Sequence, residues 1–145
     1  MKVEKLILVK IIIVTHKTLA QGFKDSLNFF TGLDKQIVAI CAYENSNQFP
    51  EKELAAEISK VKSNEKCLIL TDLLGGSVNQ NAAKYIKENI FLITGINLIV
   101  AIQLALLPAD KLTSDSIMQV VQDARKQIVF VNDYLKNKKS DFEDE

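Results

Sequence analysis

Four short apolar runs constrain the fold of this chain of 145 residues more than any other feature of its sequence. Each run is rich in β-branched residues and stays apolar along its length, which is typical of strands buried on both faces of a parallel sheet. Amphipathic helical patterns separate the runs. We therefore predict an α/β doubly wound open sheet, mainly parallel and with right-handed crossovers. The predicted strands are residues 7–15, 37–42, 67–71 and 90–93.

The segments between these runs have the periodicity of helices with one apolar face. Pro50 suits the first turn of the second helix, and Pro108 is expected to end the fourth. The predicted helices are residues 18–32, 50–62, 78–88 and 97–107, with a longer one from about residue 112.

The pattern is ambiguous near the end of the chain. Residues 127–135, QIVFVNDYL, could continue the last helix or form an antiparallel fifth strand at an edge of the sheet, and their periodicity fits both. Residues 137–145 are a charged tail. The length suits one domain with a sizeable core, so residues 1–145 are expected to form a single domain.

Composition and charge argue against several classes of function. The 18 basic residues balance 18 acidic ones, so no net charge attracts nucleic acid or an anionic membrane surface. Residues 90–109 carry no charge, but Thr94 and Gly95 read as a turn between two shorter elements, so no membrane insertion is expected. Lys10 interrupts the N-terminal apolar run and no cleavage site follows, which argues against a signal peptide.

Two cysteines, Cys41 and Cys67, lie in separate strand-like runs and lack the spacing of a metal site. We expect both to be buried thiols in a reducing compartment, and a structural zinc site is not indicated. Together with the missing signal peptide, this cysteine usage fits a cytoplasmic protein.

The only histidine, His16, directly follows the first predicted strand. Ligands of open α/β sheets bind beyond the carboxyl ends of the strands, where the strand order reverses. If the order is 2-1-3-4, the first and third strands are neighbours at that point. Asp72 directly follows the third strand, so we expect it to meet His16 at one rim, beside Gly75, Gly76 and Ser77.

Each of these residue types has a task in phosphoryl transfer. A neutral imidazole has one ring nitrogen free to attack, and a carboxylate that binds the other nitrogen fixes the tautomer. Glycines let backbone N–H groups approach a phosphate closely, and a helix start adds further donors. The predicted catalytic residues are therefore His16 and Asp72, and the predicted phosphate-binding residues are Thr15, Gly75, Gly76 and Ser77.

Structural explanations exist for each residue taken alone. His16 could be a half-buried structural residue, Asp72 a turn or helix cap, and the Gly-Gly-Ser stretch a tight turn. Their joint placement at one rim favours a function. Neither a G-x-G-x-x-G pattern nor a P-loop is present, and the turn after the first strand lacks the phosphate loop of flavodoxin-like nucleotide binders.

Three stretches resemble the IIA component of the mannose-type (mannose, fructose, sorbose) phosphotransferase system, a bacterial phosphorelay for sugar uptake. They are IIIVTHKTLAQG, LILTDLLGGSVNQNAA and ITGINLIVAIQLAL. The resemblance implies that His16 accepts a phosphoryl group from the phosphocarrier protein HPr and passes it to a IIB component. The sugar enters through the membrane components IIC and IID. Asp72 matches the active-site aspartate of the family, and Ser77 matches the serine of its glycine turn.

The resemblance also implies that the domain is a cytoplasmic homodimer, in which a C-terminal strand joins the sheet of the partner. It implies no cofactor and no metal. Two departures leave the sugar class and the choice of partners open. Lys17 stands where many members have glycine, and it either contacts phosphate or is solvated. Val78 replaces a proline.

Two alternatives keep the fold and change its use. The phosphodonor subunit of a dihydroxyacetone kinase has a related domain, although it lacks the D-x-x-G-G-S pattern. A regulatory domain could be phosphorylated on His16 without passing the group on. The sequence identifies neither the sugar nor whether the IIB component is a separate chain.

Overall fold

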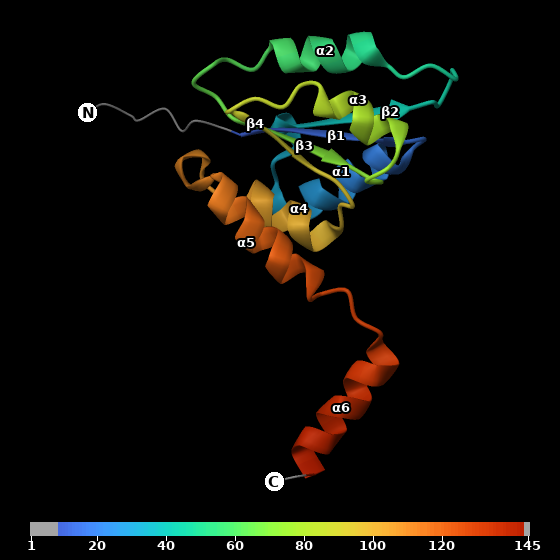
Figure 1. The fold of residues 1–145 in the computed structure, drawn as a ribbon, viewed down its shortest axis with the longest axis vertical. Helices are drawn as coiled ribbons and strands as arrows, with labels where there is room; N and C mark the ends of the chain where they lie inside the picture. Colours follow the sequence, from blue (N-terminus) through green and yellow to red (C-terminus); the bar gives the residue numbers. More distant parts are fainter. Residues whose placement is uncertain (1–8, 144–145) are drawn as a thin grey trace, which may run out of the picture.

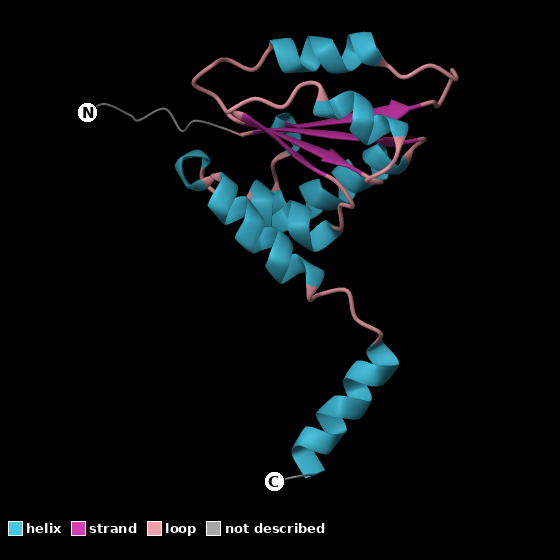
Figure 2. Cartoon of the chain, viewed as in Figure 1, coloured by secondary structure: helices cyan, strands magenta, loops and turns pink. Residues whose placement is uncertain are grey.

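The computed structural model of the protein describes residues 9–143, with side chains up to residue 139, and residues 1–8 and 144–145 lie outside the described part. Its centre is a sheet of four parallel strands in the order β2-β1-β3-β4 (Figures 1 and 2). The predicted α/β doubly wound fold and strand order are confirmed. The strands are β1 (Lys10–His16), β2 (Ile37–Ala42), β3 (Cys67–Thr71) and β4 (Ile90–Ile93). Positions 7 and 8 of the predicted first strand lie outside the described residues.

Both faces of the sheet are covered, which explains why the strands are continuously apolar. Ile11 and Ile13 of β1 point to one face and pack with α1 (Leu19–Thr31), α4 (Leu98–Ala105) and α5 (Ser114–Arg125). Ile12 and Val14 point to the other face and pack with α2 (Glu51–Ser59) and α3 (Ser77–Ala83). Figure 1 shows these two helix layers above and below the strands. All four side chains are at most 1% exposed, so β1 is rigidly held at the centre of the molecule.

The helix boundaries follow local signals in the sequence. Gly32 ends α1 in the left-handed conformation, with φ of 70°, as expected of a C-terminal glycine. Asn97 caps α4 by accepting a hydrogen bond from the Val100 N–H at 2.9 Å. Thr113 and Ser116 form a capping box at the start of α5. Short 3₁₀ turns precede β2 (η1, Asp34–Gln36) and α5 (η2, Ala109–Lys111).

The third predicted helix, residues 78–88, is shorter than expected. It ends at Ala83, and beyond Lys84 the N–H groups of Tyr85 and Ile86 bond to carbonyls three residues back, as in a tightening last turn. The uncharged segment 90–109 is divided by a turn at Gly95, with φ of 67°, as predicted. In the part of the chain that the structure describes, no helix combines the length and apolar character needed to cross a membrane.

The possible fifth strand at 127–135 is not formed in the described chain. After α5 a short extended link leads to α6 (Val131–Glu143), which projects away from the sheet and takes in most of the charged tail (Figure 1). The reason is that a strand needs a neighbour for its backbone hydrogen bonds, whereas a helix satisfies them within its own segment. The apolar side chains of Ile128 and Phe130 in the link are 75% and 72% exposed.

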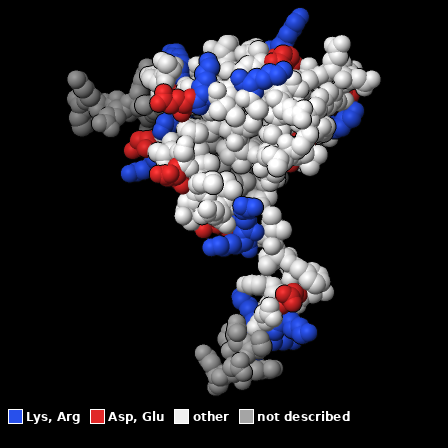
Figure 3. Space-filling model, in the orientation of Figure 1, with Lys and Arg blue, Asp and Glu red and all other residues white. Residues whose placement is uncertain are grey.

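The two cysteines differ in their surroundings. Cys67 is buried, as predicted, and burial raises the pKa of its thiol to about 12. Cys41 is only partly buried, because it is on the edge strand β2. Basic and acidic side chains are interspersed on the face of the molecule shown in Figure 3, which agrees with the zero net charge.

An ion pair fixes α2 to the sheet. Lys10 at the start of β1 donates to a carboxylate oxygen of Glu57 at 2.7 Å and to the backbone carbonyl of Glu57 at 2.9 Å. Both side chains are 19% exposed. Hydrogen bonds from Lys10 and Lys60 lower the pKa of the Glu57 carboxyl, although partial burial opposes them. The pair therefore stabilises the folded state only while Glu57 is ionised.

We predict that Glu57→Gln lowers the free energy of unfolding by roughly 1 kcal/mol at pH 7. Because the folded-state pKa of Glu57 lies below the unfolded value of about 4.3, this contribution is complete above that pH. It disappears as the pH falls through the folded-state pKa. Urea unfolding at pH 7 and at decreasing pH measures the difference, and Glu53→Gln on the exposed side of α2 is the control. A difference that is independent of pH would contradict this account.

Candidate functional site

The site lies at the rim where the parallel strands end. His16 is the last residue of β1, and its Cα pairs with that of Ala42 at the end of β2. On the other side of β1, Val14 pairs with Thr71, so Asp72 directly follows the residue opposite Val14. The strand order and register therefore bring residues 56 positions apart in sequence to one place.

Asp72 binds His16 twice. One carboxylate oxygen, Oδ2, lies 2.9 Å from the His16 backbone nitrogen and 2.9 Å from the ring nitrogen Nδ1. The other oxygen accepts the N–H of Leu73 at 3.1 Å. The side chain of Asp72 is 11% exposed, and that of His16 is 37% exposed. The structure thus brings together the two predicted catalytic residues, with the carboxylate inside and the imidazole facing solvent.

The charge of Asp72 decides which ring nitrogen of His16 is available. Burial raises the pKa of the Asp72 carboxyl, but hydrogen bonds from the His16 backbone, the His16 ring and the local backbone outweigh it and leave the pKa below its ordinary value. An ionised carboxylate can only accept, so Nδ1 carries the proton toward Asp72. The lone pair of a neutral His16 is then on Nε2, the nitrogen that can attack an electrophile.

A tight turn between β3 and α3 forms the wall beside the imidazole. The Gly76 N–H bonds to the Leu73 carbonyl at 3.2 Å, and a Cβ added at Gly76 would lie 3.2 Å from Cε1 of His16. The Asn79 side chain braces this turn, since it accepts from the Thr71 hydroxyl at 2.9 Å and donates to the Leu74 carbonyl at 3.1 Å. A side chain at position 76 would crowd the imidazole, because the ring approaches this part of the backbone closely.

Three of the four residues predicted to bind phosphate lie at this rim, and Thr15 does not belong with them. Gly75, Gly76 and Ser77 form the end of the turn and the start of α3. Thr15 is fully buried, and its hydroxyl accepts the N–H of Ala20 at 2.7 Å. Successive side chains of a strand point to opposite sides, so the side chain of Thr15 points away from that of His16 and lies beneath the first turn of α1. The side chain of Thr15 is therefore engaged at the start of α1 and points away from the rim.

Two further residues reach the rim: Tyr43, which the sequence did not assign to the site, and Lys17, for which the sequence left a phosphate contact or solvation open. Tyr43, just after β2, has its ring centroid 5.6 Å from that of His16, and its hydroxyl lies 2.7 Å from Oγ of Ser77. Lys17 donates from Nζ to the Tyr43 carbonyl at 2.6 Å. The sequence offered one indication for Tyr43, which is its position: β2 is the neighbour of β1, so the residue that follows β2 lies at the same rim as His16.

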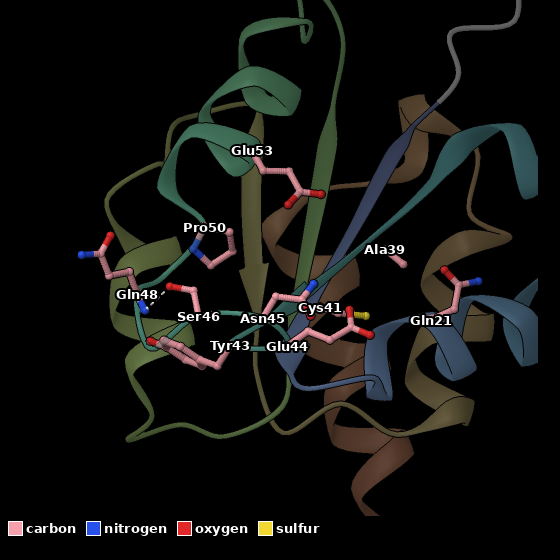
Figure 4. Close-up of a pocket in the computed structure, with 10 residues that line it drawn as sticks. All are labelled: Gln21, Ala39, Cys41, Tyr43, Glu44, Asn45, Ser46, Gln48, Pro50 and Glu53. Carbon is pink, nitrogen blue, oxygen red and sulfur yellow. Dashed lines mark hydrogen bonds between the residues drawn. The ribbon is translucent and has the colours of Figure 1, made fainter.

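A hollow of about 370 Å³ is lined in part by Tyr43 (Figure 4). It lies beside the edge strand β2, and its walls include Cys41, Glu44 and Glu53, together with Gln21 of α1. Within residues 9–143, no three His, Cys, Asp or Glu side chains gather as a metal site. The chemistry that the rim itself offers is nucleophilic attack by Nε2, with backbone N–H groups and hydroxyls nearby to hold an anion.

We predict that Gly76→Ala displaces the imidazole, because the new Cβ would press on Cε1 of His16. The ring must give way by a few tenths of an ångström, with a stability loss within about 1 kcal/mol. NMR spectra of the only histidine ring report this displacement directly. Gly75→Ala is the matched control, because nothing lies within 4 Å of its added Cβ. Equal spectral changes in both variants would refute the proposed contact.

The model of one protein family matches most of the chain. The family EIIA-man, the fructose IIA component of the phosphotransferase system, matches residues 10–122. These residues include the whole sheet and every residue of the rim. No curated protein matches the sequence significantly.

Solved structures share the fold over nearly the whole chain. A Klebsiella pneumoniae protein, provisionally identified as a phosphoenolpyruvate-dependent sugar phosphotransferase system permease, is 21% identical, with a TM-score of 0.81 over 92% of this chain and 98% of its own. The phosphotransferase system component EIIA of Streptococcus agalactiae is 25% identical, with a TM-score of 0.67 over 86% and 98%. The mannose/sorbose-specific IIA subunit of Enterococcus faecalis is also 25% identical, with a TM-score of 0.64 over 81% and 92%. The chain therefore belongs to the mannose/fructose-type IIA family of the sugar phosphotransferase system.

Proposed function

We propose that His16 carries a phosphoryl group between two proteins during sugar uptake, accepting it from HPr and passing it to a IIB component. The observation that carries this proposal is the 2.9 Å contact between Nδ1 of His16 and the Asp72 carboxylate. Because this contact occupies Nδ1, Nε2 is the nucleophile, and the side chain that carries it is 37% exposed. A nucleophile on the surface suits a reaction in which both donor and acceptor are side chains of other proteins.

The transfer is an exchange between ring nitrogens. The lone pair of Nε2 attacks the phosphorus of the donor phosphohistidine, and the P–N bond of the donor breaks as the new bond forms. The electron pair of the broken bond returns to the donor imidazole. Nδ1 of His16 keeps its proton throughout, and Asp72 stabilises the positive charge that develops on the ring.

Asp72 has a second effect once the phosphoryl group is in place. Its negative charge, held near the ring by two hydrogen bonds, repels the phosphoryl oxygens. This repulsion keeps phosphohistidine a good donor for the next transfer. Gly75 and Ser77 offset part of the repulsion by offering backbone N–H groups and a hydroxyl to the same oxygens, while the N–H of Gly76 bonds to the Leu73 carbonyl and holds the turn.

The surroundings of the imidazole fit protein partners. Leu73 and Leu74, in the turn beside His16, are 59% and 75% exposed. Large apolar side chains exposed next to a reactive group are typical of protein docking surfaces. Since both partners must reach Nε2, we propose that HPr and the IIB component use this surface in turn.

We predict that His16 is the only phosphorylation site. Incubation with phosphoenolpyruvate, enzyme I and HPr should add one phosphate per chain, labile in acid and stable in base, and His16→Gln should add none. Mass spectrometry under neutral conditions measures the stoichiometry. Persistent labelling of His16→Gln would refute the proposal.

Onward transfer separates this function from the alternatives. Isolated phosphoprotein should lose its label to a IIB component of the same family, with the label recovered on that partner. Retention of the phosphate in the presence of IIB components would favour a regulatory domain. Transfer only to a dihydroxyacetone kinase would favour the phosphodonor role.

We further propose that the chain forms a homodimer through the link before α6 and the start of that helix. Ile128, Val129, Phe130 and Val131 are four consecutive apolar residues, each at least 49% exposed. Apolar runs of this kind have strand propensity and are seldom left in water. A second copy that pairs with them would bury them and supply their backbone hydrogen bonds.

The expected result is a dimer of the full chain at micromolar concentration in sedimentation velocity. Truncation after Lys126 should give a monomer, because the link and α6 are removed while all four strands remain. Phe130→Asp should weaken the dimer with the chain length unchanged. A full-length monomer with the same sedimentation as the truncated chain would contradict the proposal.

A further inference from the structure

We propose that Tyr43 is a positioning residue for the transfer, acting through the hydroxyl of Ser77. This inference rests on the proposed function of His16. We infer that the Tyr43 hydroxyl donates a hydrogen bond to Oγ of Ser77. The Ser77 proton is then free to be donated to a phosphoryl oxygen on His16. The tyrosine thereby selects the orientation in which the serine binds the phosphoryl group.

The geometry of the rim supports each link. The Tyr43 hydroxyl and Oγ of Ser77 are 2.7 Å apart, the usual distance of an O–H···O bond. Either hydroxyl can donate while the site is empty. A hydroxyl has a single proton, so once Ser77 donates to an anion its oxygen must accept from Tyr43. The resulting chain of two bonds is cooperative, since each bond polarises the next.

The backbone at Tyr43 is held in an unfavourable conformation. Its φ is 62° and that of Lys17 is 55°, and they are the only described residues other than glycine with positive φ. Bulky residues adopt this region only when the surrounding structure enforces it, and such residues cluster at functional sites. Two bonds provide that enforcement: the Lys17 N–H to the Ala42 carbonyl at 2.7 Å, and the Lys17 ammonium to the Tyr43 carbonyl at 2.6 Å.

This arrangement assigns a structural task to Lys17. Its ammonium is engaged by the Tyr43 carbonyl, so the residue that departs from the glycine common in the family fixes the strand end that carries the tyrosine. The ring of Tyr43 is packed independently of its hydroxyl. Its centroid is 5.6 Å from that of the His16 ring and 6.4 Å from that of the Phe49 ring. Tyr43→Phe therefore removes the hydroxyl and keeps the ring in place.

A double-mutant cycle tests the proposal. The rates of phosphoryl transfer from phospho-HPr to His16, and from His16 to a IIB component, are measured by rapid quench for Tyr43→Phe, Ser77→Ala and the double variant. Loss of one neutral hydrogen bond should slow transfer by about 3- to 10-fold in each single variant. The double variant should be no slower than Ser77→Ala, because Tyr43 acts only through Ser77.

Two further variants exclude a general structural effect. Ser77→Thr keeps the hydroxyl at an exposed position, so Tyr43→Phe should still slow transfer in that background. Tyr85→Phe removes a tyrosine hydroxyl that bonds Glu51, away from His16, and should transfer at the normal rate. A normal rate for Tyr43→Phe, or effects that multiply in the double variant, would overturn the proposal. Absence of any labelling of the unaltered protein would instead refute the proposed function itself.

Discussion

The bond between Asp72 and the ring of His16 is the interaction on which the site depends. Oδ2 of Asp72 binds both the backbone nitrogen and Nδ1 of His16, so the same oxygen fixes the end of β1 and the direction of the imidazole. In the proposed transfer, a carboxylate placed in this way sets the tautomer, leaves Nε2 free and stabilises the charge that develops during attack. The glycine turn and Tyr43 lie around this pair and complete the rim.

The sheet makes such a bond possible. His16 and Asp72 meet because β1 and β3 are hydrogen-bonded neighbours in a fixed register, and that register is secured by side chains buried on both faces. The chemistry then sits on loops held by a rigid scaffold, as is common in α/β proteins. The rim also stores strain, at Lys17 and Tyr43, which the rigid strand ends can sustain.

The sequence determined the parts of the site that follow from strand order. Continuous apolar runs indicated a parallel sheet, and the rule that ligands bind where the order reverses placed His16 opposite Asp72. The strand pattern did not show that the side chain of Thr15, one position before His16, points to the opposite side, where its hydroxyl accepts the N–H of Ala20 in the first turn of α1. Tyr43 was missed, and the role of Lys17 stayed open, because the roles of both residues depend on backbone conformations that neither residue type normally adopts. Residues 127–135 remained ambiguous, since an apolar segment without a neighbour in its own chain takes its structure from whatever it contacts.

The measurement that tests the central claim most directly is the position of the phosphate on the ring. The protein has one histidine, so long-range ¹H–¹⁵N and ¹⁵N–³¹P NMR couplings of the phosphorylated, ¹⁵N-labelled chain belong to His16 alone. Because Asp72 occupies Nδ1, the phosphoryl group should be bonded to Nε2, with Nδ1 still protonated. A phosphoryl group on Nδ1 would require the bond to Asp72 to be broken, and would show that this carboxylate does not orient the reacting imidazole.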